Sequence, residues 1–345
     1  MKQPRRTIIE VAERAKVSVG TVSHVLNGVV KVSPERRARV LEAIEEMGYT
    51  RNMLAQGLRR QRSRVVGLCV PHTTVSYFTA LVNAFEEMAA ARGYEIMQVL
   101  SRQDPVTELE RIKSLLRYKV GGLILVPCNQ PKDTLDFIAK STVPVVVVDR
   151  PMQNDHRFDQ VTFDNRNAMY DATRGLITLG HRRILFVVRY RSLIVTQDRI
   201  DGLVAASREA AQPVVTDVLE CGDDEAAFRI QLAADLKKHR YTAIIFSNSM
   251  VGAWLVRTLR TFGLRCPDDI SLLAFDEPEW ADIISPALSM IRQPTREIAH
   301  KAWELLISRM NGEATEPHRV VLPAAPVEFR ETVGPVNQST ISGAA

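Results

Sequence analysis

The stretch TIIEVAERAKVSVGTVSHVLNG, which runs from Thr7 to Gly28, decides the fold of the N-terminal part of the chain. It opens with a T-x-x-E pattern, in which the hydroxyl of Thr7 and the carboxylate of Glu10 satisfy free N–H groups at a helix start. The apolar residues that follow share one helical face and are Ile8, Val11, Ala12 and Ala15. This pattern predicts a first helix.

A second helix is predicted to begin at its N-cap, Ser18, and to end at Asn27 and Gly28, which tolerate positive φ. Its inner face holds Val22, Val25 and Leu26. Its outer face is small or polar and consists of Val19, Gly20, Ser23 and His24. Two short helices joined by a tight turn form a helix-turn-helix. Small residues on the second helix would let it approach base edges in the major groove of DNA.

Two further segments complete this N-terminal head. An S-P-E sequence at 33–35 predicts the start of a third helix, which Gly48 ends. Its predicted inner stripe is Val40, Leu41, Ile44 and Met47. Segment 49–64 has five arginines and few large apolar residues, which indicates a linker. Its one short helix, from 52 to 58, is expected to fold only on DNA, because Gly57 costs about 1 kcal/mol of helix stability relative to Ala.

Charge is unevenly distributed along the 345 residues. Residues 1–64 carry 14 Lys and Arg against 6 Asp and Glu, whereas the rest carry 31 against 34. A basic head on a mildly acidic body favours a polyanionic partner at the head, because phosphate neutralisation supplies most non-specific DNA affinity. The alternative, a solvated basic tail, is disfavoured because the head has helical periodicity rather than low complexity.

The cysteines and the hydropathy indicate a cytoplasmic protein. Cys69, Cys128, Cys221 and Cys266 have no C-x-x-C spacing and are expected to be buried thiols in a reducing compartment. No apolar run approaches the length of about 18 residues that a membrane-spanning helix needs. The basic start MKQPRR leads into a helix cap rather than an apolar signal core.

From residue 65 onward, short apolar runs alternate with amphipathic helices, which is typical of a parallel α/β sheet. The predicted strands of a first series are 65–70, 96–100, 122–126 and 145–148, and its helices are 77–92, 106–117 and 132–139. A second series has strands at 184–188, 214–219, 243–246 and 270–274, and helices at 167–179, 197–211, 225–237 and 250–262. Two such lobes imply a cleft, and ligands collect where parallel strands end.

The last segments predict how the lobes connect and assemble. A helix from Thr295 to Met310 follows the second series, and we expect it to return to the first lobe. The tail from Asn337 is small and polar, which indicates disorder. The tail lacks the leucine heptads of a coiled coil, which favours a dimer over a tetramer.

Several motifs together resemble one family. The capped stretch from Thr7 is followed by KVSPERRARVLEAIEEMGY and RNMLAQGL, and then by VDRP at 148–151, FDN at 163–165, LGHRRI at 179–184 and FDE at 275–277. In this order they resemble the lactose/galactose-repressor family of bacterial transcription regulators, from about Thr7 to Thr332. The resemblance implies a homodimer that binds a pseudo-palindromic operator and represses carbohydrate or sugar-acid catabolism genes.

The same resemblance implies the domain organisation. We expect a three-helix helix-turn-helix head and a hinge helix, followed by a periplasmic-binding-protein-like core of two doubly wound parallel-sheet lobes with a small effector between them. The expected limits are 1–50 for the DNA-binding domain, 51–63 for the hinge, 64–162 with 293–320 for the N-terminal lobe, 163–292 with 321–334 for the C-terminal lobe, and 335–345 for a disordered tail.

DNA-contacting residues are also implied by the resemblance. They are Thr7, Ser18, Val19, Gly20, Thr21, Ser23, His24, Asn27, Asn52, Ala55 and Leu58. Leu58 matches the hinge leucine that wedges into the minor groove, although ordinary linker packing is an alternative. Family members usually carry arginine where this chain has His24, and an arginine gripping guanine is worth about 1–3 kcal/mol of base discrimination. The operator half-site is therefore expected to differ there.

The expected effector-binding residues are Tyr77, Phe78, Asp149, Arg189, Arg191, Arg199, Asn248 and Asp276. Structural alternatives exist: the aromatic pair could be core, and Asp276 could cap a following helix. Asp224 stands where better-known members place a stacking aromatic, and Ser249 replaces a frequent aspartate, which disfavours a purine or simple galactoside. Because Arg189 and Arg191 add positive charge near Arg199, a sugar acid or a highly hydroxylated sugar is favoured.

Two rival functions are disfavoured. A solute-binding protein of a sugar transporter would share the two lobes but would need an export signal and would lack the head. No G-x-S-x-G, P-loop or H-E-x-x-H motif and no paired carboxylates at a readable spacing support an enzyme. We therefore predict no catalytic residue, no metal site, no cofactor beyond the effector and no membrane partner.

Overall fold

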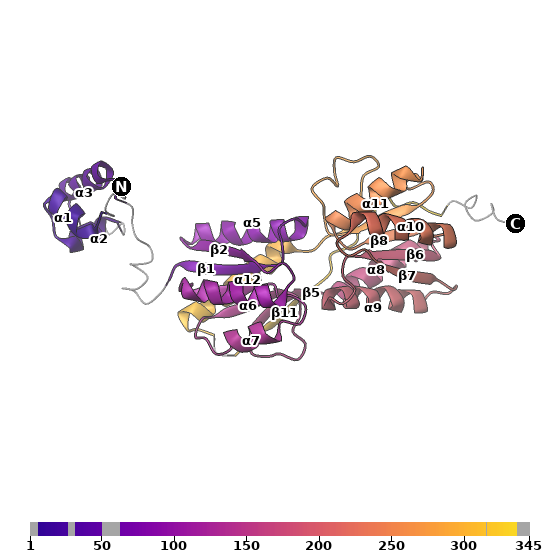
Figure 1. Cartoon of the computed structure of the whole chain (residues 1–345), viewed down its shortest axis with the longest axis horizontal. Coiled ribbons are helices and arrows are strands. Elements are labelled where there is room, and N and C mark those ends of the chain that lie inside the picture. The colour runs from indigo at the N-terminus through magenta and orange to yellow at the C-terminus, as the bar shows by residue number, and fades with distance from the viewer. Residues whose placement is uncertain (1–5, 27–31, 50–62, 315, 337–345) are drawn as a thin grey trace. The chain divides into compact units, whose positions relative to one another are not determined.

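A computed structural model describes residues 6–26, 32–49, 63–314 and 316–336. The chain divides into two compact units, Met1–Ser63 and Arg64–Ala345. Figure 1 labels many of the elements of each unit. The expected hinge, 51–63, lies largely outside the described residues and stays a prediction.

The head contains helices α1 (Ile8–Ala15), α2 (Val19–Leu26) and α3 (Pro34–Met47). The capping box of Thr7 and Glu10 is present, and Ser18 accepts a hydrogen bond from the backbone N–H of Thr21 at 3.2 Å. The small core is formed by residues of all three helices: Val11, Ala12, Ala15, Val22, Val25, Val40 and Ala43. The expectation for Leu41 was wrong. Its side chain is 51% exposed, because Ala43 occupies the inner position of α3 instead.

The N-terminal lobe is built on a parallel sheet with strand order β11-β5-β4-β3-β1-β2. Its strands are β1 (Val65–Val70), β2 (Glu95–Leu100), β3 (Gly122–Leu125), β4 (Val145–Asp149), β5 (Asp159–Phe163) and β11 (Arg319–Leu322). Its helices are α5 (Ser76–Ala91), α6 (Pro105–Arg117), α7 (Lys132–Ile138) and α12 (Thr295–Asn311).

The C-terminal lobe repeats the design with strand order β10-β9-β8-β6-β7. Its strands are β6 (Arg183–Val188), β7 (Val215–Glu220), β8 (Ala243–Phe246), β9 (Ser271–Phe275) and β10 (Ser289–Ile291). Its helices are α8 (Asn165–Thr178), α9 (Ile194–Arg208), α10 (Glu225–Lys238) and α11 (Ser249–Thr261). The predicted doubly wound α/β architecture of two lobes is confirmed.

The chain crosses between the lobes more than once. After β10, helix α12 returns to pack against α5 and the first sheet, as expected. Strand β11 pairs with β5 as far as Leu322, so the N-terminal lobe extends two residues past the expected crossing at 320. The chain then bridges Met290 to Glu328 in the C-terminal lobe. Val336, which was expected to lie in a disordered tail, donates its N–H to the carbonyl of Leu179 at 3.1 Å.

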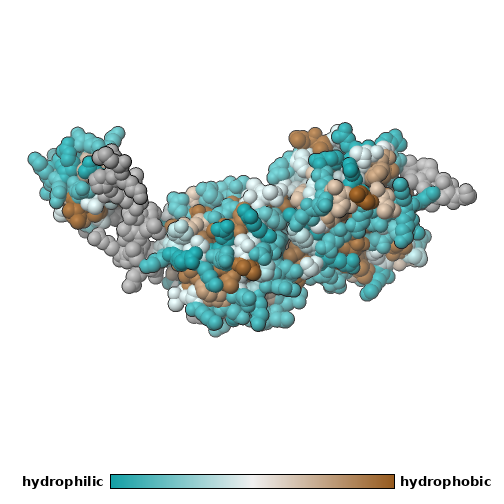
Figure 2. Space-filling view, viewed as in Figure 1, coloured by the Kyte–Doolittle hydropathy of each residue, from teal (hydrophilic) through white to brown (hydrophobic). Residues whose placement is uncertain are grey.

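The burial of the cysteines agrees with the expectation for three of the four. Cys69, Cys128 and Cys221 are buried free thiols, and Cys266 is partly buried. Hydrophilic residues cover most of the face drawn in Figure 2. In the described part of the chain, no helix has the length and apolar character required to cross a membrane.

Candidate effector cleft and DNA-binding head

Two aspartates end corresponding strands of the two lobes. Asp149 is the last residue of β4, and Asp276 directly follows β9. Both are buried, and both have left-handed backbone conformations, with φ of 71° and 89°. A non-glycine residue in this conformation stores strain that tends to occur at functional sites. The two carboxylates therefore lie where ligands collect at the carboxyl ends of parallel strands.

Arg199 of α9 lines the same pocket as these carboxylates and is itself buried. Its guanidinium carbon is 3.5 Å from the centroid of the Phe275 ring, and its Nε donates to Oδ1 of Asn165 at 2.8 Å. Burial lowers the pKa of Arg199, and the charges of Asp276 and Asp149 raise it again. The guanidinium group of Arg199 is therefore held in a fixed position over the Phe275 ring, and it keeps its positive charge.

Burial dominates the protonation of both aspartates. It raises the pKa of Asp276 to about 7, opposed by Arg199 and by a hydrogen bond that Gln293 Nε2 donates to Oδ1. It also raises the pKa of Asp149, opposed mainly by Arg150, whose Nε lies 3.6 Å from Oδ2 of Asp149. Carboxylates held this way can accept hydrogen bonds from ligand hydroxyls.

Three buried polar atoms of the same cleft have no hydrogen-bond partner among the described residues. They are the hydroxyl of Tyr77, Nε of Arg150 and Oε1 of Gln293. Tyr77 and Gln293 line one pocket with Asp149, Arg199 and Asp276. Because buried polar groups are almost always paired, these atoms indicate a place for a polar ligand.

Most of the predicted effector residues meet in this pocket. Seven line it: Tyr77, Phe78, Asp149, Arg189, Arg199, Asn248 and Asp276. Tyr77 and Phe78 also belong to the main core cluster, so the alternative that the pair is core is confirmed and their contact with an effector stays a prediction. Asn248 additionally caps α11 by accepting from the N–H of Val251 at 3.1 Å. Asp276 does not cap a helix, since no helix follows it in the described chain before α12.

The expectation for Arg191 was wrong, because it is exposed and lines a different pocket beside β7. Arg189 lies in the cleft, but its Nη2 forms an ion pair with Asp223 at 2.6 Å. Asp224, the other departure from the family pattern, caps α10 through the N–H groups of Ala226 and Ala227. The positive charge that favoured a sugar acid is therefore paired at Arg189 and lies outside this pocket at Arg191.

Sequence reasoning missed several residues of the pocket, namely His72, Gln103, Arg150, Tyr190, Ser247 and Gln293. Arg150 is buried and donates through Nη1 to Gln103 Oε1 at 2.7 Å and to the carbonyl of Pro127 at 2.6 Å. Burial lowers the pKa of His72 to about 4, so it is neutral and its Nε2 accepts from Arg189 Nη1 at 3.3 Å. The VDRP motif was the only signal for Arg150.

Hydrogen bonds join the two lobes at the margin of the cleft. The N–H of Ser76, at the start of α5, donates to Oγ of Ser249, at the start of α11, at 3.2 Å. Oγ of Ser76 donates to Oε2 of Glu279 at 2.5 Å. Ser249, noted above as a departure from the family pattern, thus takes part in holding the lobes together.

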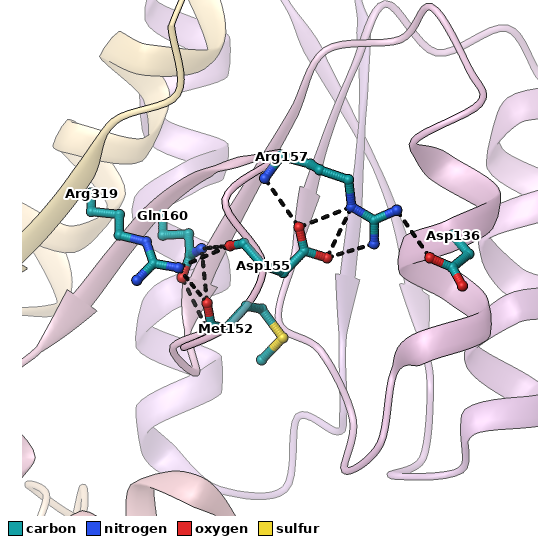
Figure 3. Close-up of polar contacts among 6 residues, drawn as sticks. All are labelled: Asp136, Met152, Asp155, Arg157, Gln160 and Arg319. Carbon is teal, nitrogen blue, oxygen red and sulfur yellow. Dashed lines mark hydrogen bonds and ion pairs between the residues drawn. The ribbon is translucent and has the colours of Figure 1, made fainter.

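The loop that leads from β4 to β5 is held by its own side chains and by residues of α7 and β11 (Figure 3). Arg157 contacts both Asp155 and Asp136, at 2.6 and 2.9 Å. Nη2 of Arg319 donates to the carbonyls of Met152, Gln153 and Asp155. This loop follows directly on Asp149 and Arg150, so its fixed path helps to hold the N-terminal side of the cleft.

In the head, the predicted DNA-contacting residues divide by exposure. Ser18, Gly20 and His24 are exposed on or beside α2, and Thr7 is exposed at the start of α1. Val19, Thr21 and Ser23 are half-buried, and Val19 packs against the head core. The remaining predicted contacts lie outside the described residues: Asn27, Asn52, Ala55 and Leu58.

Comparison with known proteins agrees with this organisation. Residues 7–52 match the family described as "Bacterial regulatory proteins, lacI family", and residues 173–333 match "Periplasmic binding protein-like domain". Catabolite control protein A of Priestia megaterium is 30% identical over 329 residues, which cover 94% of this chain and 98% of that protein. The transcriptional repressor PurR of Vibrio parahaemolyticus is 30% identical over 336 residues, covering 96% and 99%.

Solved structures are similar over the same length. The complex of the transcriptional regulator CelR with cellobiose has a TM-score of 0.70 and 26% identity, covering 95% of this chain and 100% of that chain. The Lac repressor dimer bound to operator and the anti-inducer ONPF has a TM-score of 0.82 and 24% identity, covering 96% and 100%.

Proposed function

The chain belongs to the lacI family of bacterial regulatory proteins. From that premise we propose that it is a repressor of carbohydrate genes. We propose further that a neutral, hydroxyl-rich sugar bound in the interlobe cleft controls this repression. It is a DNA-binding transcriptional regulator with a periplasmic-binding-protein-like core, and its homologues are regulators rather than enzymes. The rival function of a transporter's solute-binding protein is not favoured.

One observation carries the choice of ligand. Arg199, buried and stacked on the Phe275 ring, lines one pocket with the buried carboxylates of Asp149 and Asp276. This arrangement offers hydrogen-bond donors and acceptors in nearly balanced charge, which suits hydroxyl groups better than a free anion. The cellobiose bound by CelR supports a sugar as the ligand. We propose Tyr77, Phe78, Asp149, Arg189, Arg199, Asn248 and Asp276 as its contacts, with Gln293 added.

The proposed DNA contacts come from the head and hinge. The exposed residues of α2 would enter the major groove and Leu58 the minor groove. Assembly as a dimer on a pseudo-palindromic operator is supported by the operator-bound Lac repressor dimer of the same fold. We place the protein in the cytoplasm, where bacterial operators lie.

A thermal-shift screen tests the ligand class. Purified protein is heated with neutral sugars and polyols, with sugar acids and with nucleobases, because a bound ligand raises the midpoint by mass action. A neutral sugar should raise the midpoint, and Arg191→Gln should leave that shift unchanged. Stabilisation by sugar acids or nucleobases alone would contradict the proposed ligand class.

Two variants test the division of labour between the regions. Leu58→Ala should weaken operator binding without changing sugar affinity. Arg199→Ala should weaken sugar binding by about 10-fold or more, since hydrogen bonds to charged groups contribute about 1.5–3 kcal/mol, while leaving ligand-free DNA binding intact. Fluorescence anisotropy and calorimetry measure the two affinities, and equal effects of both variants on both affinities would contradict the scheme.

A further inference from the structure

One edge of the N-terminal lobe concentrates positive charge. The strands β1, β2, β3 and β4 all begin at this edge, and their starts are adjacent. Three hydrogen bonds establish the adjacency: Glu95 N–H to the carbonyl of Arg64 at 2.9 Å, Gly121 N–H to that of Val65 at 2.7 Å, and Leu123 N–H to that of Pro144 at 2.8 Å. The turns that precede these strands therefore lie side by side.

Five exposed basic residues occupy this edge, and we call them the basic rim: Arg64, Arg92, Arg117, Lys119 and Lys140. The guanidinium of Arg64 lies 5.9 Å from the centroid of the Tyr94 ring, next to the turn that carries Arg92. Tyr118, between two rim residues, is 54% exposed. Cations and an exposed aromatic side chain together suit contact with a phosphate backbone.

The rim charges have no ion-pair partner in the part of the chain that the structure describes. Within the described ranges, none of the five forms an ion pair within 4.0 Å, whereas many other surface arginines do. The three turns at 91–95, 117–121 and 139–144 contain one acid, Glu95. Glu304, whose pKa is lowered in part by Arg92, already pairs with Lys301 at 3.0 Å.

This concentration contrasts with the rest of the core. Residues 65–345 carry 31 Lys and Arg against 34 Asp and Glu, so the core as a whole is slightly acidic. The chain enters the core at this edge, because residues 50–62 join the head to the start of β1. The unpaired charge thus lies at the part of the core that is tethered most closely to the DNA-binding head.

We propose that the basic rim binds backbone phosphates of the same DNA that the head reads. This inference rests on the proposed function, because the head must place the core near DNA. Rim contacts would add affinity without adding sequence preference, since phosphates carry no base information. They would also speed association with DNA of any sequence.

The test compares two triple variants of the full-length protein with equal loss of charge. The rim variant carries Arg92→Gln, Lys119→Gln and Lys140→Gln. The control variant carries Lys237→Gln, Lys238→Gln and Arg240→Gln, three exposed residues at the end of α10 in the other lobe. Substitutions of exposed side chains of this kind change stability little, and a thermal melt verifies that both variants fold.

Binding to a fluorescent duplex of mixed sequence is measured between about 50 and 200 mM salt. The slope of log affinity against log salt changes by about 0.9 for each phosphate contact. The rim variant should therefore lose about 2–3 units of slope for each protomer whose rim contacts the duplex, and the control variant should match the wild type. Equal losses in both variants, or no loss in the rim variant, would overturn the proposal. A wild type that binds no DNA would instead contradict the proposed function itself.

Discussion

The two sides of the cleft each bury an aspartate, but different contacts hold the two carboxyl groups. Asp149 and Asp276 occupy equivalent places at the ends of β4 and β9, and both are buried with positive φ. Asp149 has a cation of its own lobe beside it, with Nε of Arg150 at 3.6 Å. Asp276 has an amide partner, Gln293, and no ion pair within 4.0 Å in the described part of the chain.

This difference indicates which side of the cleft has its own partners for the buried carboxyl and which side needs a ligand to supply them. The N-terminal side is stabilised by its own charges, and Arg150 is fixed in turn by Gln103 and the Pro127 carbonyl. The C-terminal side holds a carboxyl whose pKa burial has raised to about 7, beside a buried amide oxygen without a partner. We infer that Asp149 serves stability as well as binding, while Asp276 serves mainly binding.

The largest expected effect separates the two aspartates by stability. Asp149→Asn should lower the free energy of unfolding by about 3 kcal/mol, because it leaves the buried Arg150 without its neighbouring charge. At about pH 5, where the folded chain keeps Asp276 protonated, Asp276→Asn should cost about 1 kcal/mol, since the contact with Gln293 can persist. Asparagine tolerates positive φ, so the backbone is not strained in either variant. Chemical denaturation measures both, and equal losses would remove the distinction.

The next effect concerns pH. The unfolded chain releases the proton of Asp276 near the ordinary pKa of 3.8, whereas the folded chain keeps it until about pH 7. Between these values the folded state binds more protons, so stability should fall as pH rises, by at most about 1.4 kcal/mol per pH unit, and should level off above pH 7. Unfolding curves at several pH values should show a shallower decline in Asp276→Asn. Parallel curves for the two proteins would argue against a buried titrating carboxyl.

The smallest effect concerns the contact between the lobes. Ser249→Ala removes the acceptor of the Ser76 N–H and should destabilise the closed arrangement of the lobes by about 1 kcal/mol. This corresponds to about a 5-fold loss in sugar affinity. Ser207→Ala, which removes a hydroxyl that donates to the carbonyl of Leu203 within α9, is a matched control. Calorimetry with the stabilising sugar measures both variants, and a normal affinity in Ser249→Ala would show that this contact does not influence closure.

The sequence predicted the architecture and most of the cleft because strand ends are recognisable. Apolar runs followed by Asp149 and Asp276 could be located in the chain, and parallel topology then brings such positions together. Arg189 was placed correctly but its neutralising partner, Asp223, lies far along the chain and could not be paired with it.

Other features depended on tertiary contacts. Strand β5 was missed because its polar residues interrupt the apolar run, β10 because it has only three residues, and β11 because it is an edge strand with little burial. The contact between Ser76 and Ser249 joins residues 173 positions apart, which no local pattern reveals. Leu41 fitted a helical stripe but the three-helix head is too small to cover it.

The most direct test of the central claim measures whether the cleft controls the head. An operator is selected from random duplexes, and its affinity is measured with and without the stabilising sugar, for the wild type and for Asp276→Asn. The sugar should change the wild-type affinity by about 5- to 150-fold, the usual range of allosteric coupling, and should have little effect on the variant at the same concentration. A sugar that binds the wild type tightly and leaves its operator affinity unchanged would contradict the account.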